Sequence, residues 1–339
     1  MNILYQLFLI ALLFTNNIYA VVLHNLTDSG EHIEAATATA SSARVAKDEL
    51  FNPCGIVCTA SESSQESLSI FSRGQSVLVS SQIALTARHV VEGWKSNSPD
   101  RQFYVGFNNG IGVDLSLIKV KKVLCFKGQD IAALLLEEPV DIQPAEIITQ
   151  EECKTVLSNL NPQSKENPFS CMYASYSIPQ HTSGLIEKGT KESSLSISTS
   201  LEKDPDQSSF IKQAGAIYLS ELITEKGYTG DEESFLVSDL FIPTSPFSPV
   251  ACSKDFFRDQ SPILYKDSSL CISNIGKGDS GSGLFCQINR KWKLIGIASK
   301  IRHFDLYDDL GAILAKTYWS SIRLKEDRLE KAIEALLKS

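Results

Sequence analysis

The most informative stretch of this sequence is Gly276-Lys277-Gly278-Asp279-Ser280-Gly281-Ser282-Gly283. It places Ser280 among glycines, directly after Asp279 and shortly before an apolar run at 284–286. Glycines allow a tight bend that keeps a serine hydroxyl exposed and lets backbone N–H groups converge on a developing oxyanion. Because a serine hydroxyl is a poor nucleophile until a base takes its proton, this stretch predicts a base and an acid elsewhere in the chain.

Two upstream motifs supply candidates for that base and that acid. Leu85-Thr86-Ala87-Arg88-His89 ends an apolar run on a histidine, and Asp130 stands before the apolar run 131–135. A charge at the start of a buried strand needs a partner, which an imidazole provides while the carboxylate fixes its tautomer. The occurrence of the three motifs in the order His, Asp, Ser is stronger evidence for a serine activated by a base and an acid than any one motif. The alternative is that the glycine-rich stretch is a plain turn and the other two residues are coincidental.

These motifs resemble those of the trypsin/chymotrypsin family of serine proteases. The resemblance covers about Ser67 to Ile322, and Gly296-Ile297-Ala298-Ser299 is similar to the strand that lines the family's substrate cleft. It implies an all-β fold of two six-stranded antiparallel β-barrels with a C-terminal α-helix and the site in the crevice between the barrels. It also implies hydrolysis of peptide bonds through an acyl-enzyme, without a cofactor.

The resemblance gives each matching residue a role. It makes His89 the general base, Asp130 the acid that orients it and Ser280 the nucleophile. It also implies an oxyanion hole built from the backbone N–H groups of Gly278 and Ser280, and a contact between Ser299 and Asp130.

A substrate pocket is implied at the position six residues before the nucleophile. This pocket floor is Asn274, followed by Ile275. An uncharged floor argues against the preference for Arg or Lys that an acid would give, and Ile301 in place of a usual glycine narrows the entrance. We therefore expect an uncharged residue before the scissile bond. The implied walls are Ser299, Ile301 and Gly311.

Three acids on the loop that rims the pocket keep a basic side chain as the alternative preference. They could attract such a side chain, although acids on a loop are more commonly only solvated. These acids are Asp305, Asp308 and Asp309.

Eight cysteines in a chain with an export signal predict disulfides. The resemblance implies two bridges, Cys171–Cys286 and Cys252–Cys271. Two other bridges common in the family are absent, since Val90 and Gly276 stand at cysteine positions. Four cysteines are left over, and Cys54–Cys153 is the one pairing considered for them. These four are Cys54, Cys58, Cys125 and Cys153.

The first 20 residues are typical of a secretory signal peptide, with a largely apolar run from Leu4 to Thr15 and the ending Ile18-Tyr19-Ala20. The polar, Ala/Ser/Thr-rich residues 21–50 predict a leader or propeptide. No later segment reaches about 18 uninterrupted apolar residues, so no membrane anchor is expected. The sequence predicts a secreted protein, extracellular or periplasmic.

Activation of a zymogen is a further implication of the resemblance. In the family, a freed amino terminus pairs with the aspartate before the nucleophile, which is Asp279 here. A buried acid at that position needs a positive partner. The closest candidate for the activating cleavage is Arg44-Val45-Ala46, and cleavage before Ile56-Val57 is the alternative.

Short apolar runs separated by turns follow the leader and are typical of β-barrels or sandwiches. We expect an N-terminal barrel at 51–150 and a C-terminal barrel at 151–322. Residues 178–232, rich in Ser, Lys, Glu and Gly, predict a long surface insertion with a helix-like patch at Ala214 to Ile223. Apolar residues at helical spacing in 323–339 predict an amphipathic helix packed on the body.

Charge and histidine spacing argue against other classes of protein. The net charge of −8 and the lack of a basic stripe disfavour nucleic-acid binding. The scattered histidines lack the spacing of metal ligands, so no metal is predicted. The expected partner is a polypeptide substrate, and the resemblance implies a monomer. The scattered histidines are His24, His32, His181 and His303.

Two other functions are weighed against an active secreted serine endopeptidase. One is a latent or non-catalytic protease-like binding protein that holds a partner with its cleft or with residues 178–232. The other is an esterase, but α/β-hydrolases order their triad Ser, acid, His and carry Gly-x-Ser-x-Gly, whereas Ser282 stands where the closing glycine is required. Retention of all three triad residues favours the endopeptidase.

Overall fold

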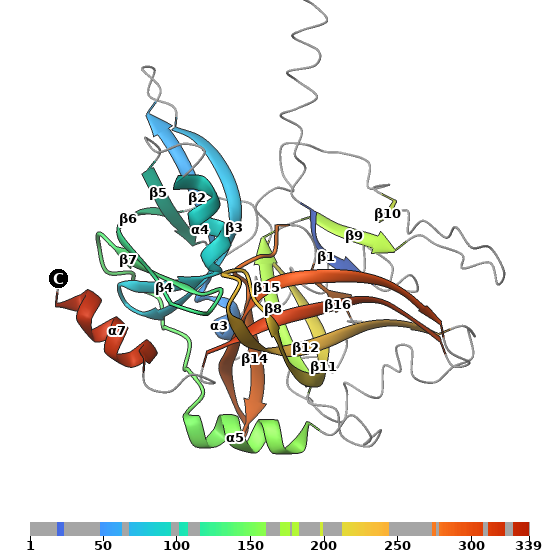
Figure 1. Cartoon of the computed structure of the whole chain (residues 1–339). Coiled ribbons are helices and arrows are strands. Elements are labelled where there is room, and N and C mark those ends of the chain that lie inside the picture. Colours follow the sequence, from blue (N-terminus) through green and yellow to red (C-terminus); the bar gives the residue numbers. More distant parts are fainter. Residues whose placement is uncertain are drawn as a thin grey trace, which may run out of the picture.

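The computed structural model of the protein is mostly β, with few helices (Figure 1). This confirms the predominance of β structure expected from the short apolar runs. The residues that the structure describes are 19–23, 48–62, 68–95, 102–107, 116–160, 170–176, 178–182, 197–198, 212–243, 273–275, 278–307, 311–322 and 328–338.

Six strands of the first half form a closed antiparallel barrel in the order β2-β3-β4-β7-β6-β5. The barrel closes because β2 pairs with both β3 and β5. The strands are β2 (Cys54–Glu62), β3 (Leu68–Ser80), β4 (Ile83–Thr86), β5 (Gln102–Phe107), β6 (Ser116–Cys125) and β7 (Ala132–Leu136).

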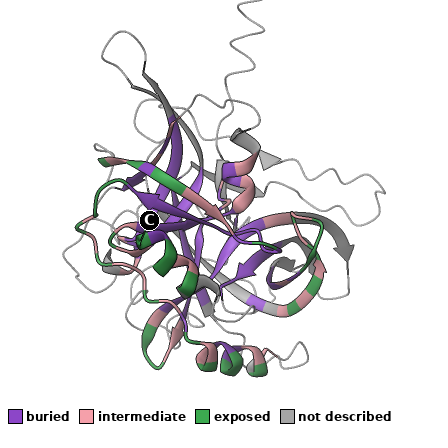
Figure 2. Cartoon of the chain, turned by 60° about the vertical axis from the view of Figure 1, so that its left-hand side comes forward, coloured by how far each residue is buried: buried purple, intermediate pink, exposed green. Residues whose placement is uncertain are grey.

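The interior of this barrel is filled by apolar side chains, as small barrels require. Both β4 and β7 are buried along their whole length, and Leu134 lies opposite Ala84 in register. Leu78, Leu85 and Leu134 belong to one hydrophobic cluster and have no exposed surface. Figure 2 shows these buried inner strands beside the more exposed helices.

A second six-stranded sheet runs in the order β11-β12-β16-β15-β14-β8, and β8 pairs again with β11. Its cluster centres on the fully buried Trp319, whose Nε1 donates to Ser238 Oγ at 3.0 Å. The strands are β8 (Ser170–Tyr176), β11 (Lys212–Lys226), β12 (Glu232–Pro243), β14 (Gly283–Ile288), β15 (Lys291–Tyr307) and β16 (Gly311–Ser321).

Strand β11 corrects one prediction. The patch Ala214 to Ile223, expected to be helical, lies inside β11 between β8 and β12. Along residues 221–226 the side chains alternate between half-buried and exposed, the period of a strand with one outer face. The part of the expected surface insertion 178–232 that begins at Lys212 is therefore sheet.

Four short strands form a separate small sheet in the order β10-β9-β1-β13. Strand β1 is parallel to β9 and antiparallel to β13, with Val22 opposite Asn274. The expected signal peptide ends inside β1, and the rest of that segment lies outside the described residues. The strands are β1 (Tyr19–Leu23), β9 (Ile178–Thr182), β10 (Ile197–Ser198) and β13 (Ser273–Asn274).

The described helices are α3 (Asp48–Phe51), α4 (Arg88–Lys95), α5 (Gln150–Asn159) and α7 (Arg328–Leu337). Helix α5 begins at a capping box, in which Thr149 and Glu152 satisfy each other's backbone N–H groups. Helix α7 confirms the predicted C-terminal helix, and its Leu336 packs on the cluster of the first barrel. No helix within the described ranges is long and apolar enough to cross a bilayer.

Candidate active site

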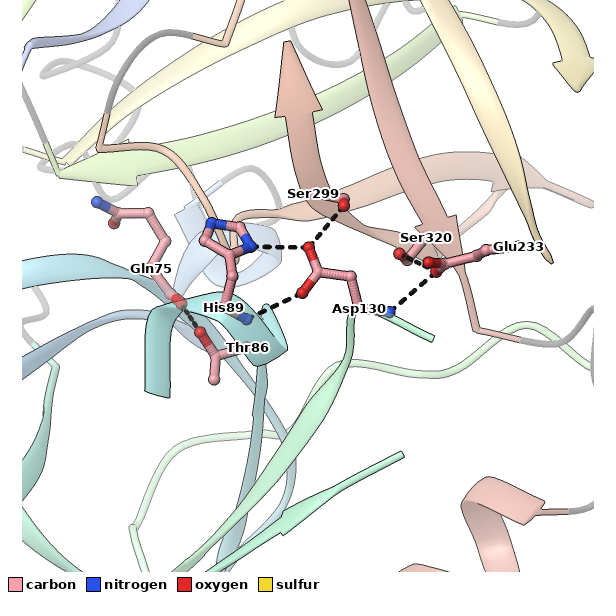
Figure 3. A network of polar contacts seen from close by, with 7 residues as sticks. All are labelled: Gln75, Thr86, His89, Asp130, Glu233, Ser299 and Ser320. Carbon is pink, nitrogen blue, oxygen red and sulfur yellow. Dashed lines mark hydrogen bonds and ion pairs between the residues drawn. The ribbon is translucent and has the colours of Figure 1, made fainter. Parts of the chain in front are cut away.

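His89 is the second residue of α4, which begins shortly after β4 ends at Thr86. Its ring Nδ1 lies 2.7 Å from Asp130 Oδ2, and its backbone N–H donates to Asp130 Oδ1 at 2.9 Å (Figure 3). One carboxylate thus contacts both the ring and the main chain of the histidine. A proton on Nδ1, shared with that carboxylate, leaves Nε2 as the nitrogen able to accept a proton.

Asp130 lies just before β7 and is only 1% exposed. Besides His89, its Oδ2 accepts a hydrogen bond from Ser299 Oγ on β15 at 2.6 Å. This bond crosses from the first barrel to the second sheet, and the region where the two meet is called the junction below. The contact expected between Ser299 and Asp130 is therefore present. Three donors satisfy this buried carboxylate, which would otherwise be costly to bury.

Ser280 reaches the same junction on the loop before β14. Its carbonyl accepts from the N–H of Gln75 on β3 at 2.7 Å, and the N–H of Gly281 donates to the carbonyl of Ala298 at 2.9 Å. The loop that bears Ser280 is thereby attached to the first barrel on one side and to β15 on the other.

The serine and the His–Asp pair share β15 as a support, because Ala298 directly precedes Ser299. Among the described residues, no hydrogen bond joins Ser280 Oγ to His89. In unliganded active sites this bond is commonly long and shortens only when substrate binds. The structure thus places the loop of Ser280 and the His89–Asp130 pair against the same stretch of β15, residues 298–299.

Gly281 is required by its surroundings. Its φ is 93°, and a Cβ there would lie 2.1 Å from the Gln75 carbonyl oxygen and 2.5 Å from Thr86 Oγ1. Gly278 also has a positive φ, of 104°. The expected oxyanion residues Gly278 and Ser280 thus flank Asp279 on a bend whose positive φ angles, at Gly278 and Gly281, favour glycine.

Gln75 is a residue that the sequence analysis missed. Its side chain is 1% exposed, with Oε1 accepting from Tyr176 N–H at 3.0 Å and Nε2 donating to the Gly278 carbonyl at 3.0 Å. Its own carbonyl accepts from Thr86 Oγ1 at 2.7 Å. A lone glutamine in a strand carries no sequence signal for this role.

Asp279, expected to receive a freed amino terminus, is fully buried and accepts a hydrogen bond from Ser175 Oγ on β8. The candidate cleavage after Arg44 lies outside the described residues. The alternative cleavage before Ile56 would fall inside β2, near its start, where Ile56 and Val57 have no exposed surface. Proteolysis prefers exposed chain, so the structure disfavours that alternative.

Four of the residues expected around the pocket come from three strands, with Ser299 and Ile301 both on β15. Asn274 ends β13, Ile301 lies half-buried on β15 and Gly311 opens β16. Ile275 differs from the expectation, because it is 2% exposed and packs in the cluster of the second sheet. Of the three rim acids, Asp305 belongs to β15, and the other two lie outside the described residues.

None of the six described cysteines is in a disulfide, which departs from the expectation for Cys171–Cys286. These two residues nevertheless lie directly opposite each other on β8 and β14, both fully buried. Burial and then the neighbouring Cys286 raise the pKa of the Cys171 thiol well above its ordinary value. The other expected bridge, Cys252–Cys271, lies outside the described residues.

The other four described cysteines are not in disulfides either. Cys54 and Cys153 pack in different hydrophobic clusters, so their suggested bridge gains no support. Burial raises the pKa of Cys58 to about 12, which makes it an inert buried thiol.

The hairpin between β11 and β12 supplies two more residues that sequence reasoning missed. The Tyr228 ring lies with its centroid 5.7 Å from that of His89, and Glu233 Oε1 accepts from the backbone N–H of Asp130 at 3.0 Å. Tyr228 falls in residues 178–232, which were expected to form a surface insertion, and neither residue belongs to a motif.

The described ranges hold no group of three or more side chains suited to a metal ion. No family model matches this chain, and no curated protein matches it.

Proposed function

We propose that this protein is a serine endopeptidase of the trypsin/chymotrypsin type, with Ser280 as nucleophile. The observation that carries the proposal is the chain of contacts from His89 through Asp130 to Ser299, beside the glycine loop that bears the serine. The return of β8 to β11 in the second sheet supports a two-barrel arrangement with the site at the junction.

In the proposed mechanism, Ser280 Oγ forms a bond to the carbonyl carbon of the scissile peptide while its proton passes to His89 Nε2. Asp130 stabilises the imidazolium that results. The backbone N–H groups of Gly278 and Ser280 stabilise the oxyanion. The imidazolium then gives its proton to the departing amine as the C–N bond breaks, and water repeats the sequence on the acyl-enzyme.

The proposal includes an uncharged residue before the scissile bond, read by a pocket over Asn274 with Ile301 on one wall. It also includes export as a zymogen, because Asp279 is a buried acid for which a freed amino terminus would be a partner.

Labelling of the purified protein with a fluorophosphonate probe tests the proposal, before and after limited trypsin treatment. We expect labelling that is lost in Ser280→Ala and kept in Ser282→Ala, which removes a neighbouring buried hydroxyl. Labelling only after trypsin would identify a zymogen. Absence of labelling in both states would overturn the proposal in favour of a protease-like binding protein.

A further inference from the structure

Glu233 occupies a buried position behind the His–Asp pair. It is the second residue of β12, directly after the turn in which Gly227 N–H donates to the Asp231 carbonyl at 2.9 Å. Its exposed fraction is 1%, whereas the preceding Glu232 is exposed. A carboxylate is rarely buried to this extent unless donors surround it.

The donors to Glu233 come from both halves of the molecule. Oε1 accepts from the backbone N–H of Asp130 at 3.0 Å and from Ser320 Oγ on β16 (Figure 3). Space for the other oxygen depends on Gly227, since a Cβ there would lie 2.3 Å from Glu233 Oε2. The absence of a side chain at Gly227 thus leaves room for the Glu233 carboxylate within the hairpin.

The segment that carries Asp130 is a turn across which the Phe126 N–H donates to the Ile131 carbonyl at 3.0 Å. It precedes β7, whose ladder begins at Ala132. Its neighbour Gln129 donates through Nε2 to the Ser321 carbonyl at 3.2 Å, so two successive residues are attached to the second sheet. Without Glu233, the buried N–H of Asp130 would lose its acceptor, and one restraint on the rotation of this peptide would be gone.

We propose that Glu233 is a positioning residue, which fixes the main chain at Asp130 and through it the orientation of the carboxylate toward His89. This inference rests on the proposed function. Because Asp130 contacts His89 through both carboxylate oxygens, a small rotation of its peptide lengthens both bonds at once. Glu233 also adds a second negative charge behind the imidazolium formed during catalysis.

Other charged and titratable groups around His89 are few among the described residues. Asp130 contacts the ring directly, and Tyr228 lies against it. On the same helix, Arg88 is paired with Glu92 at 2.7 Å, which raises the pKa of the Arg88 guanidinium. A change at Glu233 therefore alters a small set of charges, and the acidic limb of the pH–rate profile reports on it.

The test compares Glu233→Gln, Glu233→Leu and the matched exposed control Glu232→Gln. The rate of fluorophosphonate labelling and the hydrolysis of fluorescent casein are measured from pH 5 to 9, with near-UV circular dichroism as the check of folding. The low-field proton resonance of the His89–Asp130 hydrogen bond, assigned with His89→Ala, gives a readout that needs no catalysis.

We expect Glu233→Leu to lower the labelling rate at least 30-fold and to weaken or shift the low-field resonance. Glu233→Gln keeps an acceptor for the Asp130 N–H, so it should retain activity within about fivefold, with its acidic limb moved to lower pH because a negative charge is gone. Glu232→Gln should match the wild type.

A folded Glu233→Leu protein with wild-type labelling and an unchanged resonance would overturn the inference. If the leucine variant does not fold, Glu233→Gln decides: a loss of labelling rate of 30-fold or more in a variant that keeps the acceptor would overturn the inference, and retained activity with an acidic limb moved to lower pH would support it. If the wild type shows the resonance but takes no label, the proposed function fails. The positioning role is then judged on the resonance alone.

Discussion

The first barrel and the second sheet use strand length differently. Strands of the barrel have between 4 and 13 residues, whereas β11, β12, β15 and β16 have 15, 12, 17 and 11. The barrel presents His89 and Asp130 just beyond its strand ends. The long strands bring Ser299 and Glu233 to the same place from the other side. The barrel thus carries the His89–Asp130 pair, and the second sheet supplies hydrogen-bond partners to Asp130.

The largest expected effect is that of a substitution at Asp130, the acid that the first barrel contributes. Asp130→Asn should lower kcat about 10⁴-fold, because an amide stabilises the wrong tautomer of His89 and cannot balance an imidazolium. Casein hydrolysis and the labelling rate measure the loss. Asp141→Asn, at an exposed acid of the same barrel, should be neutral. A residual activity within tenfold of wild type would contradict the assigned role of Asp130.

A second prediction asks whether the two halves unfold as one unit. Leu134→Ala in the barrel and Leu236→Ala in the second sheet each remove a buried side chain, and each should lower the free energy of unfolding by about 2–5 kcal/mol. Leu222→Ala, at a 41% exposed side chain, should change it by less than about 0.5 kcal/mol.

Urea titrations followed by tryptophan fluorescence and far-UV circular dichroism measure these changes. Bonds such as Gln129 Nε2 to the Ser321 carbonyl cross the junction, so we expect coincident transitions in every variant. Two separated transitions, each sensitive to one leucine, would show instead that the halves are independent.

The third prediction concerns Gln75 on β3, which attaches the loop of Gly278 and Ser280 to the first barrel. Gln75→Leu removes the acceptor for Tyr176 N–H and the donor to the Gly278 carbonyl, so labelling should slow about 10- to 100-fold and stability should fall by about 2 kcal/mol. The control is Gln102→Leu, which removes side-chain bonds to the Phe103 and Val120 carbonyls within the barrel. Equal slowing in both variants would mean that Gln75 has no special relation to the site.

The smallest expected effect is on the free energy of unfolding, and it comes from Lys293 on β15, away from the site. Lys293 Nζ contacts Glu146 and Glu152, each at 2.8 Å. Its hydrogen bond, followed by that of the Thr149 backbone, lowers the pKa of Glu152 to about 2. A carboxyl whose folded-state pKa is lowered contributes stability above its unfolded value, and this is lost as the pH falls toward 2.

Lys293→Met should therefore cost about 1 kcal/mol at pH 7, and the difference from wild type should shrink as the pH falls from about 5 to about 2. Urea titrations at several pH values measure it. Lys291→Met, at an exposed neighbour, should show no such trend. A difference that stays constant with pH would assign the loss to packing instead.

The sequence predicted best where a residue's type and its place in a pattern agreed. His89 and Asp130 are polar groups at the ends of apolar runs, and the structure joins them. The C-terminal helix followed from apolar periodicity. The capping box of Thr149 and Glu152 was also readable, although α5 was not predicted from it.

The remaining features depend on contacts between distant segments. Side chains at residues 221–226 of β11 alternate between half-buried and exposed, but their polar and apolar types do not alternate, so only the pairing of β11 with β8 and β12 separates it from a helix. Gln75 and Glu233 gain their roles from partners 203 and 103 residues away. No local pattern encodes such distances, so these residues could not be found from the sequence.

Strand β1 begins at Tyr19, so the expected end of the signal peptide lies inside a strand. Removal of the first 20 residues would delete the pairing of Tyr19 with Ile178 and leave those of Val22 and Leu23 intact. The amino terminus of the exported chain would then be Val21, one residue before the pairing with Asn274. Removal of the signal peptide would therefore place a new ammonium group, that of Val21, beside the strand of the expected pocket floor.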